Sequence, residues 1–212
     1  MTYSFYIRIY FIETFYYAAH MVIFKKQYFL IIENTRDINL SNIKKKNKFT
    51  IIYRYHKSDE KFSHLLRFKY LCKKKSIKLY IANNLNLALK LKADGLYVSS
   101  YNKNLKFKNY ITSKFEIIGS AHNLWEINLK RKQGCNSIFL SRLFKTDYED
   151  KKGFLGLIRF NLISRSFKNL TLIPLGGIRL SNLNYLKNVS CTSLAIFSEV
   201  KKKPAKIFSR LF

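Results

Sequence analysis

Glycine, proline, cysteine and tryptophan are all scarce in this chain of 212 residues. With 7 glycines and 2 prolines, the sequence has no low-complexity linker and no visible boundary between domains. The 3 cysteines, Cys72, Cys135 and Cys191, are far apart and form no Cys-x-x-Cys pair, which argues against a disulfide framework and a zinc site. We therefore expect a protein of the reducing cytoplasm.

Acidic residues are also few. The 40 lysines and arginines against 12 aspartates and glutamates give a formal net charge of +28, which is typical of proteins that bind a polyanion such as nucleic acid. However, the lysines fall in short clusters along the whole chain, and Ile, Asn, Phe and Tyr, whose codons are also A/T-rich, are abundant too. Genome composition explains the excess of lysine better than a nucleic-acid partner does.

A long hydrophobic run is missing as well. The first twenty residues are aromatic-rich, but Arg8 and Glu13 interrupt them, so the stretch is too short and too polar to span a bilayer. We predict no membrane span. We treat residues 1–20 as an extension outside the domain, either disordered or not translated if translation begins at Met21, with a segment that lies in a membrane interface as the alternative. We assign residues 21–212 to one domain.

Hydrophobic residues make up 48% of the whole sequence. From Tyr28 onward, short apolar runs alternate with longer amphipathic ones. This alternation is typical of strands that are separated by crossover helices. We predict eight strands, at Tyr28–Ile32, Phe49–Arg54, Ile77–Ile81, Leu96–Val98, Phe115–Gly119, Ser137–Leu140, Leu170–Ile173 and Leu194–Phe197.

The helical pattern is clearest in two places. Apolar residues fall on one face between Glu60 and Lys75, and a second helix is predicted from Leu124 to Lys132, with Gly134 as its C-terminal stop. Further helical segments are predicted after Asn84 and near Leu183–Lys187. Eight strands in so short a chain favour an α/β fold of one closed (β/α)8 TIM barrel. An open doubly wound sheet is the alternative, but no Gly-x-Gly-x-x-Gly follows the first strand.

In such a barrel, functional residues lie just after the strands, at the carboxyl-end face. The polar and special residues at those positions are Arg54, His56, Lys57, Asn83, Asn84, Ser99, Ser100, Asn102, Ser120, His122, Arg142, Phe144, Thr146, Gly176, Gly177 and Ser198.

Gly176 and Gly177 are the strongest local signal, because two of only 7 glycines stand side by side after a strand. Glycine lets backbone N–H groups approach a phosphate, and the loops after strands seven and eight of a barrel are a recurrent phosphate site. Ser198 would donate its hydroxyl there. A plain tight turn after Pro174 is the alternative.

Arg54 ends an otherwise apolar strand, where a guanidinium suits an anion such as a diphosphate, although a surface salt bridge is the alternative. Ser120 and His122 invite the hypothesis of a serine nucleophile activated by histidine. We see no carboxylate placed to orient His122, so we set that hypothesis aside.

Seven motifs, taken in order and spacing, resemble the thiamine-phosphate synthase/TenI family between about Lys25 and Val200. They are Ile51–Arg54, Leu79–Leu89, Ala93–Val98, Gly119–His122, Leu140–Thr146, Leu175–Ile178 and the strand that ends in Ser198.

The resemblance implies an enzyme that joins an aminopyrimidine diphosphate to a thiazole phosphate, releases pyrophosphate and uses Mg²⁺. It implies a diphosphate-binding role for Arg54 and a place near the reacting centre for Ser120, so these two are the catalytic candidates. The substrate-binding residues that it implies, besides Arg54, are His56, Asn83, Thr146, Lys152, Gly176, Gly177 and Ser198.

Several positions depart from the family pattern. Asn83 and Asn102 stand where the synthases carry two Mg²⁺-binding aspartates, and amides are poorer ligands for this cation. His56 replaces a lysine, and Arg142 stands where the TenI-type tautomerases carry a histidine. The resemblance therefore implies Mg²⁺ only if the protein is catalytically active.

Three hypotheses follow. The first is the synthase itself, acting on a phosphorylated pyrimidine and thiazole and yielding thiamine phosphate. The second is a non-catalytic or regulatory barrel that binds a phosphorylated ligand. The third, a basic nucleic-acid binder, rests on net charge alone and ranks last. A homodimer is compatible with each of them.

Overall fold

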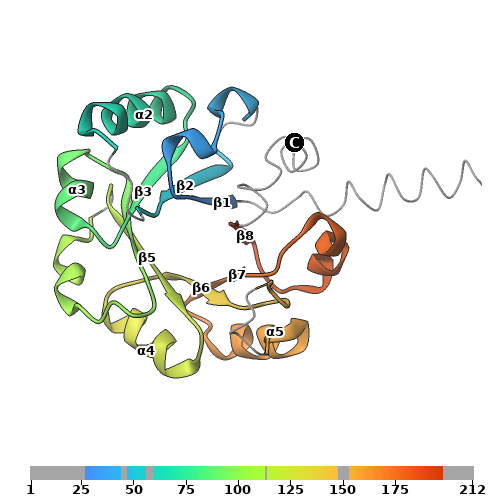
Figure 1. Ribbon diagram of the computed structural model, residues 1–212. Helices are drawn as coiled ribbons and strands as arrows, with labels where there is room; N and C mark the ends of the chain where they lie inside the picture. Colours follow the sequence, from blue (N-terminus) through green and yellow to red (C-terminus); the bar gives the residue numbers. More distant parts are fainter. Residues whose placement is uncertain (1–26, 44–46, 56–59, 113, 148–152, 198–212) are drawn as a thin grey trace, which may run out of the picture.

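The computed structural model describes residues 27–43, 47–55, 60–112, 114–147 and 153–197, and these form one barrel of eight parallel strands. The hydrogen-bonded order is β7-β6-β5-β4-β3-β2-β1-β8, and its two end strands lie side by side, so the barrel is nearly closed (Figure 1). The strands are β1 Gln27–Ile32, β2 Phe49–Tyr53, β3 Lys78–Ala82, β4 Gly95–Val98, β5 Glu116–Ala121, β6 Ser137–Ser141, β7 Thr171–Leu175 and β8 Ser193–Ile196.

Helices form the outer ring of the molecule (Figure 1). The α-helices are α2 Phe62–Lys74, α3 Leu85–Lys90, α4 Leu124–Lys132 and α5 Gly156–Ser166, and the 3-10 helices are η1 Thr35–Asp37, η2 Leu40–Asn42, η3 Leu105–Tyr110 and η4 Leu180–Asn188. Among the described residues, none of these helices is long and apolar enough to span a bilayer.

The core has two layers because successive strand residues point to opposite faces of the sheet. In β1, Phe29 and Ile31 point into the barrel, whereas Leu30 and Ile32 pack against the outer helices. Aromatic rings fill the interior: the Phe29 and Phe139 centroids lie 5.1 Å apart, and those of Tyr97 and Phe139 5.6 Å apart. The barrel is therefore a packed core and not a pore.

The predicted fold and all eight strands are confirmed, with boundary differences of one or two residues. The helix from Leu124 to Lys132 is confirmed, and Gly134 follows it with a φ of +88°. The segment around Leu183–Lys187 is helical, but it is a 3-10 helix. The sequence did not indicate α5, because apolar residues on its exposed side, such as Ile158 and Leu162, obscure the amphipathic pattern.

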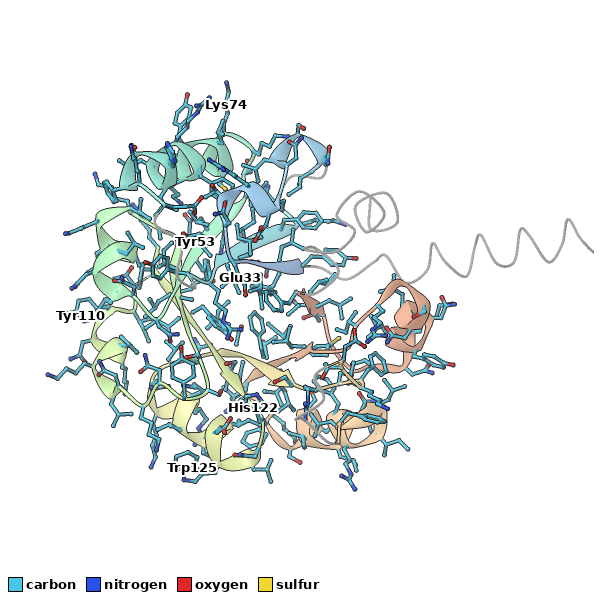
Figure 2. All side chains as sticks on the ribbon, in the orientation of Figure 1. Glu33, Tyr53, Lys74, Tyr110, His122 and Trp125 are labelled. Atoms are coloured by element: carbon cyan, nitrogen blue, oxygen red, sulfur yellow. The ribbon has the colours of Figure 1, made fainter. Side chains whose placement is uncertain are left out.

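The sequence has lysine clusters at 44–46, 73–75 and 201–203, and the second of these lies in the described chain, at the end of α2. Lys74 sits on the outer rim of the molecule, where basic residues favour the C-terminal end of a helix dipole (Figure 2). The predicted extension of residues 1–20 lies outside the described residues.

A polar cluster lies at the amino ends of β3 and β5. The hydroxyl of Tyr80, which points into the barrel and is fully buried, donates to Glu116, and Lys78 Nζ donates to the other carboxylate oxygen at 2.8 Å. Burial raises the pKa of Tyr80, so its phenol stays neutral. Burial also acts to raise the pKa of Glu116, but the hydrogen bonds from Lys78 and Tyr80 outweigh it and hold that pKa below its usual value.

We predict that Glu116→Leu lowers the free energy of unfolding by roughly 1–3 kcal/mol, because it leaves the buried Tyr80 hydroxyl without an acceptor. Urea unfolding at pH 7 measures the change. Because the pKa of Glu116 is depressed in the fold, the difference from wild type is present at neutral pH and shrinks as the pH falls below about 4.

Two controls separate the buried contact from the exposed one. The double variant Glu116→Leu/Tyr80→Phe removes both partners and should regain most of the loss. Lys78→Met breaks only a half-exposed ion pair and should change stability by less than about 1 kcal/mol. A double variant no more stable than Glu116→Leu would contradict this account.

Candidate functional site

A cavity of about 530 Å³ opens at the carboxyl ends of the strands, and we call it the mouth. Because parallel strands bring their carboxyl ends to one end of the barrel, residues distant in sequence meet there. The mouth is lined by Ile31, Glu33, Arg54, Tyr97, Ser99, Ser100, Tyr101, Ser120, His122, Ser141, Arg142, Thr146, Leu175, Gly176, Gly177, Ile178, Ala195, Ile196 and Phe197.

The structure thus brings most of the described candidate residues together. Arg54, Ser120, Thr146, Gly176 and Gly177 all line the mouth, although they come from four different strand ends. Their proximity at one cavity agrees with the prediction for a barrel; their individual roles stay predictions. His56, Lys57, Lys152 and Ser198 lie outside the described residues.

The floor of the mouth is formed by Tyr97 of β4 and Ser120 of β5, which both point inward from neighbouring strands. Their hydroxyls are hydrogen-bonded. Burial raises the pKa of Tyr97, and the hydrogen bond to Ser120 and the charge of Arg54 offset only part of that effect. The floor is therefore neutral at physiological pH and can offer hydroxyl groups, but no charge, to a ligand.

Arg54 follows β2 and supplies a cation at the rim of the mouth. Its guanidinium carbon lies 5.9 Å from the centroid of the Phe197 ring, a cation–π distance. Within the described part of the chain, no carboxylate forms an ion pair with it. The surface salt bridge considered from the sequence is not found among these residues, so the guanidinium is available to an anionic ligand.

The loops after β6 and β7 pack directly on each other. Leu143 N–H donates to the Leu175 carbonyl at 3.0 Å, and Phe144 N–H donates to the Gly176 carbonyl at 3.1 Å. Further out, Arg179 pairs with Asp147. The two loops therefore form one wall of the mouth.

Gly177 has a structural role in this wall that the sequence did not indicate. Its φ is +68°, and a Cβ there would lie 2.4 Å from the carbonyl oxygen of Phe144. Only glycine permits this contact between the loops. Across the described residues, the N–H groups of Gly177 and Ile178 donate to no partner, as a phosphate cradle requires. Because any side chain at 177 disrupts the wall, a substitution there does not test phosphate binding specifically.

Thr146, in the same wall, has a buried hydroxyl oxygen with no hydrogen-bond partner among the described residues. Buried polar groups are nearly always paired, and an orphan of this kind needs an explanation such as an absent ligand. Its position agrees with the phosphate contact that the family resemblance implies for Thr146.

A second cavity borders the mouth and shares Arg54 and Tyr101 with it; Asn83 and Asn102 line this neighbour. Asn83 Oδ1 accepts from Ser99 N–H at 3.0 Å, from Ser99 Oγ at 3.0 Å and from Asn102 Nδ2 at 3.3 Å. Because a backbone N–H can only donate, the first bond fixes which amide atom is the oxygen.

This network does not fit Mg²⁺. The amide oxygen of Asn83 already accepts three hydrogen bonds, and Mg²⁺ prefers carboxylate and water oxygens in an octahedral arrangement. Among the described residues, no group of three or more His, Cys, Asp or Glu side chains could hold a metal ion. The two positions that the resemblance assigns to metal ligands are thus used for hydrogen bonds within the protein.

Lys130 is a site-supporting residue that the sequence analysis missed. It lies on α4, is fully buried, and its Nζ donates to Ser99 O at 2.6 Å, Asn102 O at 2.7 Å and Gln133 Oε1 at 2.8 Å. Burial lowers the pKa of Lys130 to about 8, so the side chain is mostly charged at pH 7. The signal was available: with Ile127 on the buried face, position 130 is expected to be apolar.

His122 has a carboxylate partner, and our expectation that it has none was wrong. The ring Nδ1 of His122 lies 3.1 Å from Glu126 Oε2, and the backbone N–H of His122 donates to the same oxygen at 2.7 Å. Glu126 lies in the first turn of α4, so these contacts cap the helix. In the described chain no hydrogen bond joins Ser120 to His122, and the serine-nucleophile hypothesis gains no support.

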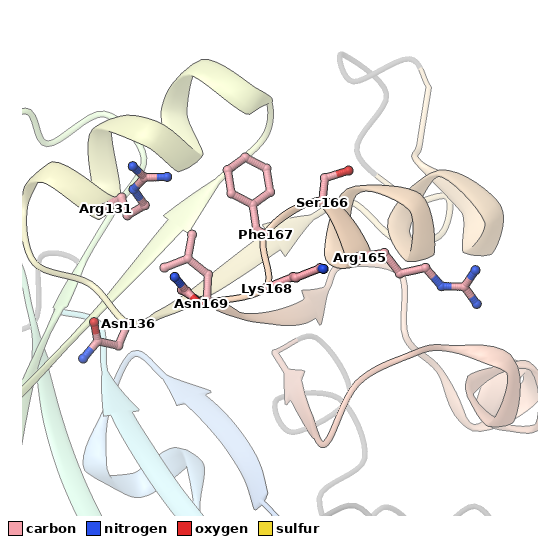
Figure 3. A pocket seen from close by; sticks show the side chains of 8 residues that line it. Arg131, Asn136, Arg165, Ser166, Phe167, Lys168 and Asn169 are labelled. Atoms are coloured by element: carbon pink, nitrogen blue, oxygen red, sulfur yellow. The ribbon is translucent and has the colours of Figure 1, made fainter.

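A hollow at the opposite end of the barrel is lined by Arg131, Arg165 and Lys168, among other residues (Figure 3). Arg131 and Arg165 lie in the last turns of α4 and α5, and their side chains point away from each other. Basic residues favour helix C-termini through the dipole alone. We therefore assign no ligand to this hollow.

Comparison with known proteins finds a matching family model and several similar proteins. Residues 32–200 match a family model described as thiamine monophosphate synthase. A thiamine-phosphate synthase from Prochlorococcus marinus subsp. pastoris is 30% identical over 152 residues, which cover 70% of this chain and 43% of that protein. One from Flavobacterium johnsoniae is 29% identical over 161 residues, 72% of this chain and 76% of that protein.

The chain thus spans about two-fifths of the length of the Prochlorococcus relative. Among solved structures, a thiamine phosphate pyrophosphorylase from Pyrococcus furiosus superposes with a TM-score of 0.66 and 17% identity, covering 90% of this chain and 97% of that one. At that identity the superposition supports the fold alone.

We predict that Thr146→Val leaves the free protein as stable as wild type or about 1 kcal/mol more stable, because it replaces an unpaired buried hydroxyl with a methyl group of similar size. Thermal and urea unfolding of both proteins measure this. A clear loss of stability would mean that the hydroxyl has a partner in the protein and is not held for a ligand.

Proposed function

The chain belongs to the thiamine monophosphate synthase family, and we propose that its mouth binds the phosphorylated substrates of the synthase reaction and joins them. These are an aminopyrimidine diphosphate and a thiazole phosphate. The bond between the pyrimidine methylene carbon and the diphosphate oxygen breaks, and pyrophosphate leaves with the electron pair. The lone pair of the thiazole nitrogen forms the new C–N bond, which gives thiamine phosphate. We also propose that the protein acts in the cytoplasm.

The observation that carries this proposal is the set of unpaired anion-binding groups at the mouth. Arg54 has no carboxylate partner, Thr146 has an unpaired hydroxyl, and the N–H groups of Gly177 and Ile178 have no acceptor, all within the described chain. Donors without acceptors in one cavity favour a ligand rich in acceptor oxygens, and a phosphate is such a ligand.

The positions of these groups suggest how two phosphorylated molecules share the mouth. Thr146 and Gly177, in the wall formed by the loops after β6 and β7, suit the single phosphate of the thiazole. Arg54, on the other side, suits the diphosphate, and its guanidinium can stabilise negative charge as pyrophosphate departs. Ser120, hydrogen-bonded to Tyr97 on the floor between them, is placed to orient the reacting rings.

Among the described residues we assign no divalent metal to this scheme, because the amide oxygen of Asn83 accepts from Ser99 and from the Asn102 amide. That same observation favours a second candidate function, a barrel that binds the phosphorylated ligand without turnover. The two candidates share the binding site and differ in whether leaving-group charge is stabilised well enough for the C–O bond to break.

A turnover assay separates the two. We predict that purified protein, given both substrates, forms thiamine phosphate, and that 5 mM Mg²⁺, on the order of a common assay level, changes the rate by less than about threefold, since Asn83 and Asn102 do not fit this cation. Product is measured by chromatography after oxidation to a fluorescent thiochrome. Tight substrate binding without product would leave the binder as the function.

We predict that Arg54→Met weakens pyrophosphate binding by about tenfold to a hundredfold, the effect of losing a charge-assisted hydrogen bond of roughly 1.5–3 kcal/mol. Isothermal titration measures the affinity. Arg67→Met is the matched control, because Arg67 is exposed on α2, away from the mouth, and its loss also removes one positive charge. Equal weakening in both variants would show that net charge, and not the site, binds the anion.

A further inference from the structure

The buried ammonium of Lys130 lies directly behind the turn after β4, and this turn lines the mouth. The three N–H bonds of Lys130 are all used, on the carbonyls of Ser99 and Asn102 and on the Gln133 side chain. Gln133, equally buried, donates from Nε2 to Asn102 O and to Asn104 O, both at 2.9 Å. The loop after β4 is therefore held at three of its carbonyl groups by two side chains, Lys130 of α4 and Gln133, the C-cap residue of that helix.

The barrel makes room for this lysine. Its stem passes over Gly119 of β5, where a Cβ would lie 2.8 Å from Lys130 Cδ. No described carboxylate forms an ion pair with Lys130. All three hydrogen bonds of this buried ammonium go to neutral oxygens, and the charge of Glu126 acts on it without direct contact. A buried charge without an ion pair lowers stability relative to an apolar residue, so we expect a role beyond packing for it.

The loop that Lys130 holds is a tight turn. Asn102 N–H donates to Ser99 O at 3.1 Å, which makes Ser99 to Asn102 a β-turn with Ser100 at its second position. The Ser99 carbonyl points at Lys130. Since the C=O and N–H of a trans peptide point in opposite directions, the N–H of Ser100 points away from Lys130.

Ser100 lines the mouth, and among the described residues its N–H donates to no acceptor. A cation at the oxygen end of a peptide group polarises that group and strengthens its N–H as a donor, as it does in a hydrogen-bonded chain. The positive charge of Lys130 therefore strengthens the Ser100 N–H as a hydrogen-bond donor to a ligand in the mouth.

We propose that Lys130 and the peptide group between Ser99 and Ser100 form a metal-free anion-binding unit in the turn after β4, which lines the mouth, and that this unit takes a phosphate or diphosphate group. Lys130 is a positioning residue, because it acts through the peptide and does not touch the ligand. The proposal deepens the function proposed above and rests on it.

The other side of the same turn supports this assignment. The N–H and hydroxyl of Ser99 and the amide of Asn102 all bind Asn83 Oδ1, so the turn is fixed from both sides before any ligand arrives. Such preorganisation reduces the loss of entropy on binding. A divalent ion is not needed to order these residues, and Asn83 leaves no oxygen to bind one.

Replacing Ser100 by proline tests the N–H directly. Proline has no N–H and is favoured at the second position of type I and II turns, so Ser100→Pro removes the donor while it retains the turn. In buffer with EDTA, we expect it to weaken inorganic pyrophosphate binding by about tenfold. Ser100→Ala, which keeps the N–H and loses only the hydroxyl, should stay within about threefold of wild type.

Lys130→Met tests the cation, with Lys132→Met as its control, because Lys132 is an exposed lysine in the same turn of α4. We expect a loss of at least about tenfold for Lys130→Met and less than about twofold for Lys132→Met. Circular dichroism confirms that each variant is folded. If Lys130→Met does not fold, the pair of Ser100 variants decides the question.

The outcomes separate this proposal from the function on which it rests. Two results would overturn the metal-free unit and leave the proposed function standing. In the first, wild-type protein binds pyrophosphate only after Mg²⁺ is added. In the second, Ser100→Pro binds pyrophosphate as tightly as Ser100→Ala. Wild-type protein that binds neither pyrophosphate nor thiazole phosphate, with or without Mg²⁺, overturns both.

Discussion

The parallel hydrogen-bonded ladder is the constraint on which the rest of the structure depends. Because all eight strands run the same way, every strand delivers its following loop to one end of the barrel. Arg54, Ser120, Thr146 and Gly177 are far apart in the sequence and meet at one cavity for this reason alone. Below the mouth, the rings of Phe29, Tyr97 and Phe139 fill the interior of the barrel.

The fold was predictable because the apolar runs of the strands are short, regular and separated by turn residues. The position of the candidate site was predictable too, since strand ends can be read from the sequence once a barrel is assumed. Interactions between loops were not: nothing near Gly177 in sequence shows that Phe144 lies against it, and Glu126 was not recognised as the partner of His122. Lys130 was missed for a different reason, since a lysine among 40 basic residues is expected at the surface.

Gly177 and Thr146 show why a match to a family pattern does not by itself assign a role. Both lie in the wall of the mouth, where the resemblance implies phosphate contacts. Gly177 is required by the packing of two loops whether or not a phosphate is present, because a Cβ there would meet a backbone oxygen at 2.4 Å. Within the described chain, no packing contact explains why position 146 is a threonine, because its buried hydroxyl has no hydrogen-bond partner there. The hydroxyl of Thr146 is therefore a stronger argument for a ligand than Gly177 is.

The resemblance implies carboxylates at the positions of Asn83 and Asn102, and amides there change the charge of the site as well as its ligands. Carboxylates at these positions would need a cation between them, whereas Asn83 and Asn102 are neutral and hydrogen-bond to each other. In the unit proposed above, the cation is instead the Lys130 side chain, which belongs to α4 and carries one charge, where a divalent metal ion would carry two. One fixed charge and Arg54 can hold a phosphorylated ligand, but they neutralise less of the charge that develops on departing pyrophosphate. Binding and catalysis therefore depend on different features of this site, and the first can persist where the second is slow.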